Sequence, residues 1–464
     1  MAQPMQESRS ISHLVQVLKR VGIDRAVGFT VLGRGWAAVS GLVTLLLLVH
    51  YLSPVQQGYY FTFGNILALS VFVEMGLSLL LVQFASHERA NLHWTPSGTL
   101  EGDSAAKARL SSLLQLSAKY YAVVGALLLV IVMPLGALFF HGHSTSGIRW
   151  QIPWLWVALV SAATIVLLPV LSILEGCGLI AQIARLQMWQ NIVGSLLLWL
   201  ALISHWGLYA APITNTVVLL CQIGWIAATK RAWLFDLLRY PPGENQINWR
   251  GEVWPLQWKI AIACISGYFT FQLFNPILFA TRGAAVAGQM GLSLAVIMTV
   301  TAISIAWVTT KVSPFGILIA RRDFAALDHL FFSCLWQSWV LVTVASALVW
   351  GVGVWLYAAH LPISIRFLPP LPLALLAVSA VFNHGVFAEA AYLRAHKQEP
   401  FFLSSLGFAV LTALSGLLLA RPFGASGMLL GYLVACALNL ALSTHIFQQK
   451  RREWHQSVLS VTSL

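Results

Sequence analysis

A single carboxylate, Glu74, lies inside the apolar stretch 59–82. A carboxylate in hydrocarbon costs roughly 2.5–3.5 kcal/mol on insertion scales, so a helix that carries one usually turns it toward partner helices or a water-filled path. Ser70, Glu74 and Ser78 are spaced i, i+4, i+8, which would place them on one face of a continuous helix. The stripe predicts a proton or cation site inside a cavity. A structural hydrogen bond or ion pair to another helix is the alternative.

Neutral hydrogen-bonding groups recur farther along the chain. Tyr268, Gln272 and Asn275 are spaced i, i+4, i+7, and Pro276 follows them. Amides and aromatic rings are the groups that bind sugars, and the proline removes a backbone hydrogen bond and can kink the helix. The pattern predicts contacts to sugar, with amide bonds between helices as the alternative.

Cations stand at the ends of two apolar stretches. Ser304, Trp307 and Lys311 are spaced i, i+3, i+7, and Arg34 lies at the start of the first stretch. We expect Arg34 and Lys311 to contact the phosphate end of an anionic substrate, and Trp307 to be a further substrate-binding residue. Snorkelling of the two long cationic side chains to the membrane interface is the other interpretation.

Two acid–base pairs, Glu175 with Arg185 and Glu389 with Arg394, bracket short loops. They are interpreted as solvated helix ends or as salt bridges of a cytoplasmic gate. Enzyme and nucleotide-binding motifs are absent, and the five cysteines have no metal-ligand spacing. The sequence therefore predicts no catalytic residue, no metal and no cofactor.

Composition shows which elements must position these residues. The 464-residue chain is 58% hydrophobic and only 9% charged, whereas soluble domains have about 25% charged residues. Runs of about 20 apolar residues are long enough to cross ~30 Å of hydrocarbon. We predict an all-α polytopic membrane protein with twelve spans, near 28–52, 59–82, 120–140, 152–174, 186–204, 207–228, 259–280, 286–310, 334–357, 367–388, 401–420 and 424–446.

The distribution of positive charge predicts the orientation. Of the 27 lysines and arginines, 23 fall on the side of the N-terminus and only four on the other side, at Arg149, Arg282, Arg366 and Arg421. Basic residues accumulate on the cytoplasmic side of membrane proteins, so both termini are predicted to be cytoplasmic. This distribution also accounts for the net charge of +12 without nucleic-acid binding.

Polar connections divide the chain into five parts. Residues 1–27 are predicted to form an amphipathic cytoplasmic segment, because Ile11, Leu14, Val15 and Leu18 recur at helical spacing. Six spans follow in 28–232, a cytoplasmic linker in 233–258, six more spans in 259–447, and a cytoplasmic tail in 448–464. A weak internal repeat, which aligns Gly58 with Gly288, supports two six-helix bundles around a central cavity.

LSPVQQGYYFTF…FVEMGLSLLLVQFASHE, within residues 51–92, resembles the O-antigen flippase type of bacterial polysaccharide exporter. Residues 286–323, VAGQMGLSLAV…VTTKVSPFGILIARRD, resemble the matching part of the second half of these proteins. They belong to the multidrug/oligosaccharidyl-lipid/polysaccharide (MOP) exporter superfamily.

The resemblance implies an inner-membrane protein that turns undecaprenyl-pyrophosphate-linked oligosaccharide to the periplasmic leaflet by ion-coupled alternating access, for O-antigen or exopolysaccharide biosynthesis. Its expected partners are the lipid-linked oligosaccharide and membrane lipids, with a polysaccharide polymerase and a chain-length regulator as candidates. The alternatives are a cation-coupled multidrug exporter of the same superfamily, a membrane-embedded polymerase or acyltransferase, and a scaffold for glycan assembly.

Overall fold

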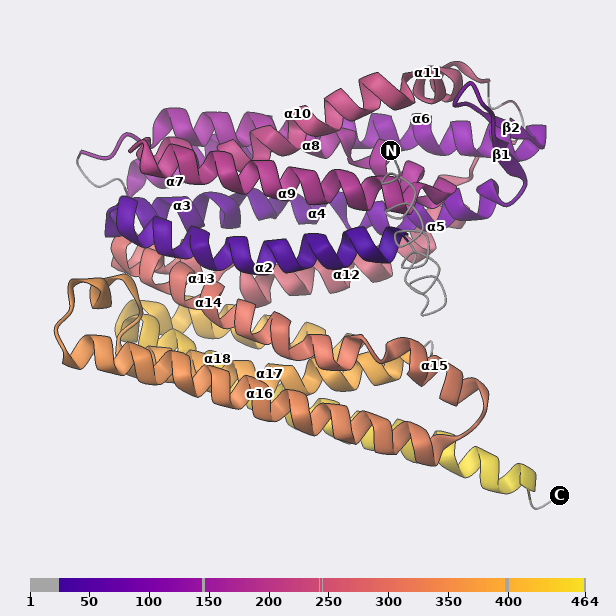
Figure 1. The fold of residues 1–464 in the computed structure, drawn as a ribbon. Helices are drawn as coiled ribbons and strands as arrows, with labels where there is room; N and C mark the ends of the chain where they lie inside the picture. Colours follow the sequence, from indigo (N-terminus) through magenta and orange to yellow (C-terminus); the bar gives the residue numbers. More distant parts are fainter. Residues whose placement is uncertain (1–24, 144–146, 242, 244, 397–399, 463–464) are drawn as a thin grey trace, which may run out of the picture. The chain divides into compact units, whose positions relative to one another are not determined.

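The computed structural model describes residues 25–143, 147–241, 243, 245–396 and 400–462 (Figure 1). The predicted amphipathic segment 1–27 lies, up to residue 24, outside the described residues. The chain forms two compact units. Unit 1 comprises Met1–Leu47, Gly76–Pro134 and Gln151–Trp258, and unit 2 comprises Leu48–Met75, Leu135–Trp150 and Lys259–Leu464. Unit 2 takes up the chain at Lys259, where the second bundle is predicted to begin, but residues 48–75 and 135–150 also pack in unit 2.

Unit 1 is mainly helical. Its helices are α2 (Arg25–Tyr51), α5 (Leu77–Arg89), α6 (Ser104–Leu127), α8 (Gln151–Leu174), α9 (Ile180–Ile203), α10 (Ile213–Trp225) and α11 (Arg231–Arg239). Short 3₁₀ or π turns are η2 (Leu128–Val132), η3 (Glu175–Leu179), η4 (Gly207–Ala210), η5 (Ile226–Lys230) and η6 (Trp249–Val253), and the two strands are β1 (Leu92–Trp94) and β2 (Leu100–Gly102).

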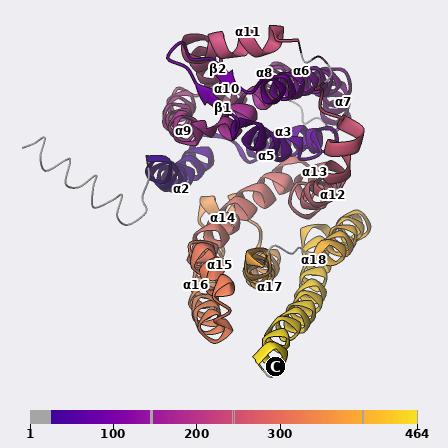
Figure 2. The ribbon, with the colours of Figure 1, turned by 90° about the vertical axis from the view of Figure 1, so that its right-hand side faces the viewer.

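Every regular element in the described residues of unit 2 is a helix. Its elements are α3 (Pro54–Leu67), η1 (Ala68–Ser70), α4 (Val71–Glu74), α7 (Met133–Gly142), α12 (Trp254–Phe271), α13 (Phe274–Arg282), α14 (Ala284–Thr309), α15 (Val312–Ala320), α16 (Phe324–Ala358), η7 (Pro362–Arg366), α17 (Pro370–Ala395) and α18 (Phe402–Thr462). In Figure 2 the view runs along α17, with α16 and α18 on either side of it.

Within the described residues, nine helices are long and apolar enough to cross a membrane, or ten if one bent pair counts as a single span. In hydrocarbon every backbone N–H and C=O must be bonded within the protein, which is why apolar runs of this length fold as helices. The chain is therefore a multi-pass membrane protein whose candidate spans are helices. Gly178 and Gly424 have non-helical backbone angles inside the two longest of these helices.

The bent pair corrects one prediction. The apolar stretch 59–82 is not a continuous helix, because Met75 and Gly76 adopt left-handed backbone angles (φ 52° and 67°). The helical segments on either side of these residues, Pro54–Glu74 and Leu77–Arg89, are bent by 48°. The prediction that Ser70, Glu74 and Ser78 share one helix face is therefore wrong, since Ser78 lies beyond the break.

Unit 2 brings two glycines into close contact where α3 packs against α14. A Cβ atom on Gly58 would lie 1.8 Å from the carbonyl oxygen of Ala284, and one on Gly288 would lie 2.8 Å from the backbone of Pro54 and Gly58. Small residues allow the backbones of membrane helices to approach in this way. The two glycines that the internal repeat aligns thus meet within one unit.

Unit 1 contains a β-hairpin that an all-α prediction did not include. Leu92 pairs with Gly102 and Trp94 with Leu100, and Gly98 takes φ 82° in the connecting turn. The Trp94 indole N–H donates to the carbonyl of Cys177 at 3.1 Å, which ties the hairpin to η3.

Candidate functional site

Three amide side chains of unit 2 form a cluster at a break in a membrane helix. Asn65 on α3 donates through Nδ2 to Oε1 of Gln272, and its own Oδ1 accepts from Nδ2 of Asn275 at 2.8 Å. Asn65 and Asn275 are buried, and Gln272 is partly exposed. The cluster therefore joins α3 to the junction of α12 and α13.

Pro276 accounts for the position of this break. In a continuous helix the carbonyl of Gln272 would accept from the N–H of residue 276, but proline has none. Accordingly α12 ends at Phe271 and α13 begins at Phe274, so the helix is interrupted at Gln272 and Leu273. The break leaves Gln272 between two helices, where its side chain reaches the neighbouring α3.

Not all of the hydrogen-bonding capacity of the cluster is used. Asn275 Oδ1 is buried and has no hydrogen-bond partner among the described residues. A buried acceptor left unpaired costs about 1–3 kcal/mol, so a donor from water or from a ligand hydroxyl would be stabilising there. The cluster is neutral, and its available chemistry is hydrogen bonding to uncharged polar groups.

Tyr268, the third member of the predicted stripe, lies on α12 one turn before Gln272, outside the amide cluster. Its ring is 6% exposed and packs edge-on against Phe72, with centroids 5.3 Å apart. The structure thus unites Gln272 with Asn275 through Asn65, whereas Tyr268 makes an aromatic contact.

A second amide on α3 reinforces the contact between α3 and α14. Gln57 is 1% exposed, and its Nε2 donates to the carbonyl of Gly288 at 2.7 Å and to that of Arg366 at 3.3 Å. Burial lowers the pKa of the Arg366 guanidinium from its ordinary value. Gln57 fastens α14 and η7 to the start of α3.

The start of α3 is itself defined by a capping box. The Ser53 hydroxyl accepts from the N–H of Gln56, the Gln56 side chain accepts from the N–H of Ser53, and Pro54 occupies the first turn. The capping box sets the point from which Gln57, Gly58 and Asn65 are positioned.

The two cations predicted to bind phosphate, Arg34 and Lys311, are exposed, whereas Ser304 of the same stripe as Lys311 is not. Ser304 is buried and donates within its own helix to the carbonyl of Val300 at 2.9 Å. Trp307 is 48% exposed and lines an open pocket of roughly 560 Å³ with Trp336 of α16. Lys311 is exposed at the junction of α14 and α15, and Arg34 is exposed on α2 in unit 1. Their role in binding phosphate stays a prediction.

Glu74 is partly exposed and ends α4, with Ser70 four residues before it. Its proposed role in ion coupling no longer rests on a three-residue stripe and stays a prediction.

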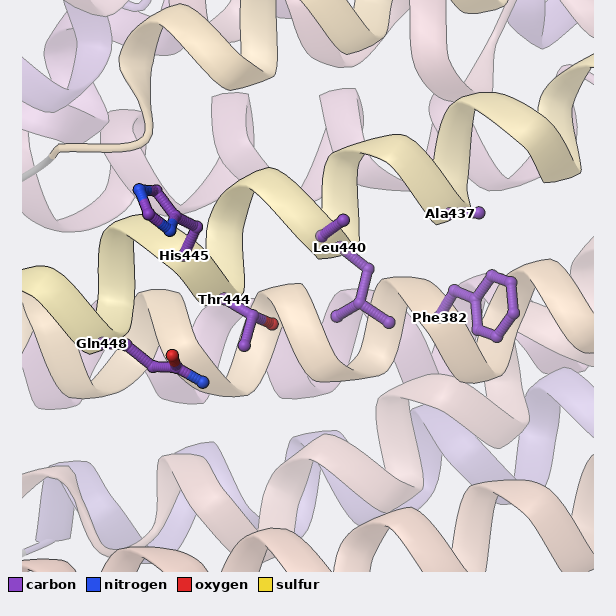
Figure 3. Close-up of a pocket in the computed structure, with 7 residues that line it drawn as sticks. Phe382, Ala437, Leu440, Thr444, His445 and Gln448 are labelled. Atoms are coloured by element: carbon purple, nitrogen blue, oxygen red, sulfur yellow. The ribbon is translucent and has the colours of Figure 1, made fainter.

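Glu389 is the most buried of the four predicted gate residues. Its side chain is 6% exposed, and Oε1 accepts from the Thr444 hydroxyl at 2.7 Å. Oε2 is buried without a hydrogen-bond partner among the described residues. Thr444 also lines an open pocket of roughly 410 Å³ between α17 and α18, together with His445, Gln448 and Phe382 (Figure 3).

The other gate residues are less buried. Arg394 and Arg185 are exposed, and Glu175 is partly exposed within η3. Their assignment to a gate stays a prediction.

Sequence reasoning missed Asn65, Gln57 and Thr444. Asn65 and Gln57 are isolated amides in an apolar helix, which was a usable signal, because polar side chains in such helices usually bond to other helices. Nothing in the sequence around Thr444 indicates its bond to a carboxylate 55 residues away.

The fold is similar to that of solved membrane transporters, one of which is described as a MATE family transporter of the MOP superfamily. Lipid II flippase MurJ in its inward closed conformation aligns with a TM-score of 0.63, at 11% identity over 93% of this chain and 91% of that chain. The MATE multidrug transporter DinF-BH gives a TM-score of 0.56 at 12% identity, covering 92% and 95% of the two chains. A mutant of the Vibrio cholerae MATE transporter VcmN gives 0.55 at 13% identity, covering 96% and 98%.

No protein-family model and no curated protein matches the chain. The solved structures that share the fold are transporters, not enzymes, and at these identities they show the fold alone.

Proposed function

We propose that this protein is an inner-membrane flippase that moves a lipid-linked oligosaccharide across the bilayer by ion-coupled alternating access. The observation that carries the proposal is the neutral amide cluster of Asn65, Gln272 and Asn275 at a helix break. Uncharged amides suit the hydroxyl groups of sugars and give little attraction to the cationic substrates of many drug exporters. The unpaired Asn275 Oδ1 is the acceptor we assign to a sugar hydroxyl.

The proposal includes twelve membrane spans, two more than the ten counted above. Gln151–Ile203 and Phe402–Trp454 each contain 53 residues, which at 1.5 Å per residue is about 80 Å of helix, more than twice the ~30 Å of hydrocarbon. Each also breaks at a glycine, Gly178 or Gly424, with positive φ. If each supplies two spans, ten helices become twelve, with both termini on the cytoplasmic side.

The remaining assignments follow from the predicted chemistry. Arg34 and Lys311 would meet the phosphate end of the substrate, Trp307 would also contact the substrate, and Glu74 would bind the coupling ion. Glu389 and Arg394, with Glu175 and Arg185, would act in a cytoplasmic gate.

A multidrug exporter is the second candidate. It is favoured by the pocket beside Trp307 and Trp336, whose other lining residues are mostly apolar, and by the similarity of the fold to that of the multidrug transporter DinF-BH.

The decisive experiment uses a strain that lacks this gene and a membrane-impermeant glycan probe on spheroplasts. Without the protein the lipid-linked repeat unit should accumulate on the cytoplasmic face, and the wild-type gene should relieve this. Gln272→Leu and Glu74→Gln should each reduce display at least tenfold at matched expression. Gln190→Leu, which removes a buried amide of α9 in unit 1, is the matched control and should leave display intact.

Normal display in the deletion strain would contradict the flippase. Raised drug resistance on expression of the wild-type gene would then support the multidrug exporter.

A further inference from the structure

Helix α11 of unit 1 presents an exposed face of unusual composition. Its exposed residues include Arg231, Phe235, Leu238 and Arg239, spaced i, i+4, i+7, i+8. This spacing places two cationic and two apolar side chains along one stripe of the helix. Phe235 is 55% exposed and Leu238 38% exposed, and the Arg239 guanidinium lies over the Phe235 ring, with its Cζ 5.6 Å from the centroid.

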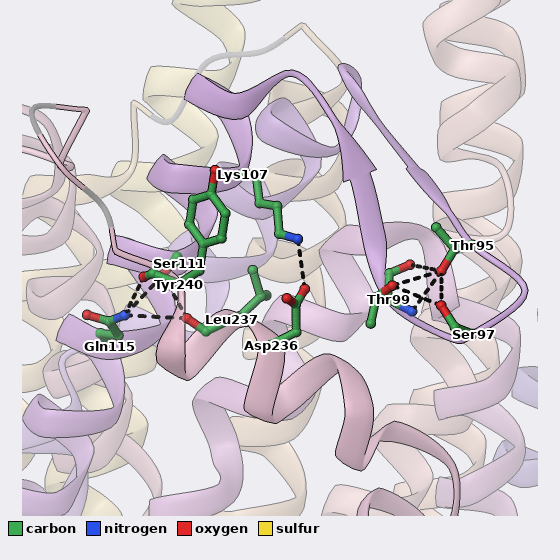
Figure 4. A network of polar contacts seen from close by, with 9 residues as sticks. All are labelled: Thr95, Ser97, Thr99, Lys107, Ser111, Gln115, Asp236, Leu237 and Tyr240. Carbon is green, nitrogen blue, oxygen red and sulfur yellow. Dashed lines mark hydrogen bonds and ion pairs between the residues drawn. The ribbon is translucent and has the colours of Figure 1, made fainter.

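The opposite face of α11 is docked on unit 1. Trp233 and Leu237 are fully buried. The only acidic residue of the helix, Asp236, is turned inward and forms an ion pair with Lys107 of α6 at 2.9 Å (Figure 4). The negative charge is therefore neutralised on the docked side, and the exposed stripe carries positive charge alone.

The C-terminal end of α11 is also held by α6. The Ser111 hydroxyl lies 2.7 Å from the carbonyl oxygens of Leu237 and Tyr240, and Gln115 Nε2 donates to the carbonyl of Tyr240 at 3.1 Å (Figure 4). Gln115 Nε2 also donates to the carbonyl of Leu238 at 3.1 Å. These contacts fix the rotation of the helix about its own axis, so the exposed stripe keeps one orientation.

The predicted spans 207–228 and 120–140 place both ends of α11 near the edge of the hydrocarbon. At the first end, α11 follows η5 directly, and the backbone turns at Lys230 (φ −125°, ψ 6°). At the second end, Gln115 and Ser111 stand five and nine residues before residue 120, where an apolar span is predicted to begin. At 1.5 Å per residue these distances are about 8 and 14 Å, at or just outside the headgroup layer. Figure 2 shows α11 lying across the helices of unit 1 and not along them.

We propose that the exposed stripe of α11 binds anionic phospholipid, with Arg231 and Arg239 contacting headgroup phosphates and Phe235 and Leu238 entering the acyl boundary. Amphipathic helices with cationic and aromatic side chains lie in the interface in this manner. A soluble acidic protein is a poorer fit, because a helix anchored at the bilayer edge at both ends meets lipid first. Lipid binding at α11 does not depend on the identity of the transported substrate. A failure of this proposal would therefore leave the proposed transport function unaffected, and the reverse also holds.

The first test measures the stability of the full-length protein in nanodiscs of phosphatidylcholine alone or mixed with phosphatidylglycerol. Wild type should gain about 2–4 °C in Tm from the anionic lipid. Arg231→Gln with Arg239→Gln should lose most of that gain. Arg321→Gln with Arg322→Gln, which removes two exposed arginines of unit 2, is the charge-matched control and should keep it. Equal loss in both pairs, or no loss in the first, would overturn the proposal.

The second test reports the environment of the stripe directly. A spin label at Phe235→Cys, in a chain whose five cysteines are replaced by alanine, should collide more often with oxygen than with a polar relaxant. A label at Ser97→Cys, in the exposed turn of the hairpin, should show the reverse. Equal access of the polar relaxant to both sites would place the stripe in water and favour a soluble partner.

Discussion

The apolar helix contact of unit 2 and the polar end of unit 1 are held together by different physics. Where α3 meets α14 and α13, the contact consists of glycine backbones in close approach and neutral amide bonds through Gln57 and Asn65. At the polar end of unit 1, Arg109 bonds to Glu88 at 2.8 Å and to Glu252 at 2.6 Å, and Lys107 bonds to Asp236.

The difference follows from the cost of charge in hydrocarbon. A neutral amide satisfies its partner without the desolvation penalty that an ion would carry. Near water an ion pair carries a much smaller penalty, but added salt weakens it, because the Debye length falls from about 10 Å at 0.1 M to about 3 Å at 1 M. The unit 2 contact should therefore depend on shape and be insensitive to salt, and the unit 1 network should show the opposite behaviour.

The largest loss of stability is expected at the close contact between α3 and α14. Gly58→Ala would place a methyl group 1.8 Å from the carbonyl oxygen of Ala284, which is backbone and cannot rotate away. Overpacking commonly costs 1–3 kcal/mol, and this contact should lie at or above about 3 kcal/mol. We expect little monodisperse protein by fluorescence-detected size-exclusion chromatography, at any salt concentration.

Gly64→Ala is the matched control for this change, because it lies on the same helix and no atom stands within 4 Å of the position that its methyl group would take. It should preserve yield and raise stability by roughly 0.5–1 kcal/mol through helix propensity. Equal yields for the two variants would mean that α3 and α14 are not in close contact.

An intermediate effect is expected in the ion-pair network of unit 1. Arg109→Gln leaves Glu88 and Glu252 facing a neutral side chain, so both lose a charge-assisted hydrogen bond. With 30% of the Arg109 side chain exposed, solvent reduces the loss to about 1–2 kcal/mol. Tm should fall by a few degrees in low salt, and the difference from wild type should shrink in 0.5 M NaCl.

The control for this change is Lys450→Gln, which breaks the exposed pair with Glu453 on α18 and should leave Tm unchanged. A loss at Arg109 that is the same at all salt concentrations would show that the arginine acts through packing, and the contrast between the two units would then fail.

Much of the fold could be predicted from the sequence because hydrocarbon permits so few backbone structures. The helix end near His205 is confirmed, because α9 ends at Ile203 and His205 has φ 58°. The division predicted near Pro422 stays a prediction, because α18 continues through it with non-helical backbone angles at Gly424. The break at Met75 was not predictable, since a left-handed methionine is unusual and is stabilised only by its surroundings.

The candidate site could be predicted only in part. Gln272 and Asn275 were identified from their spacing and from Pro276, all of them local signals. Their partner Asn65 lies 207 and 210 residues earlier, and a single sequence carries no record of that contact. The hairpin at Leu92 was missed for another reason, because its three-residue strands are too short to show alternation.

The smallest change in stability is expected for Glu389→Gln. Glu389 is a buried carboxylate of unit 2, and it is an exception to the use of neutral polar groups in the α3–α14 contact of that unit. Glu389→Gln keeps a carbonyl oxygen for the Thr444 hydroxyl and removes any charge from apolar surroundings, so the free energy of unfolding should change by less than about 1 kcal/mol. Thr444→Val, which takes away the hydroxyl that Oε1 accepts from, should cost more, about 1–3 kcal/mol. If instead Glu389→Gln were the more damaging variant in Tm measurements, the carboxylate would be charged in the folded protein and held by a cation. Unit 2 would then share the electrostatics of unit 1 at this position.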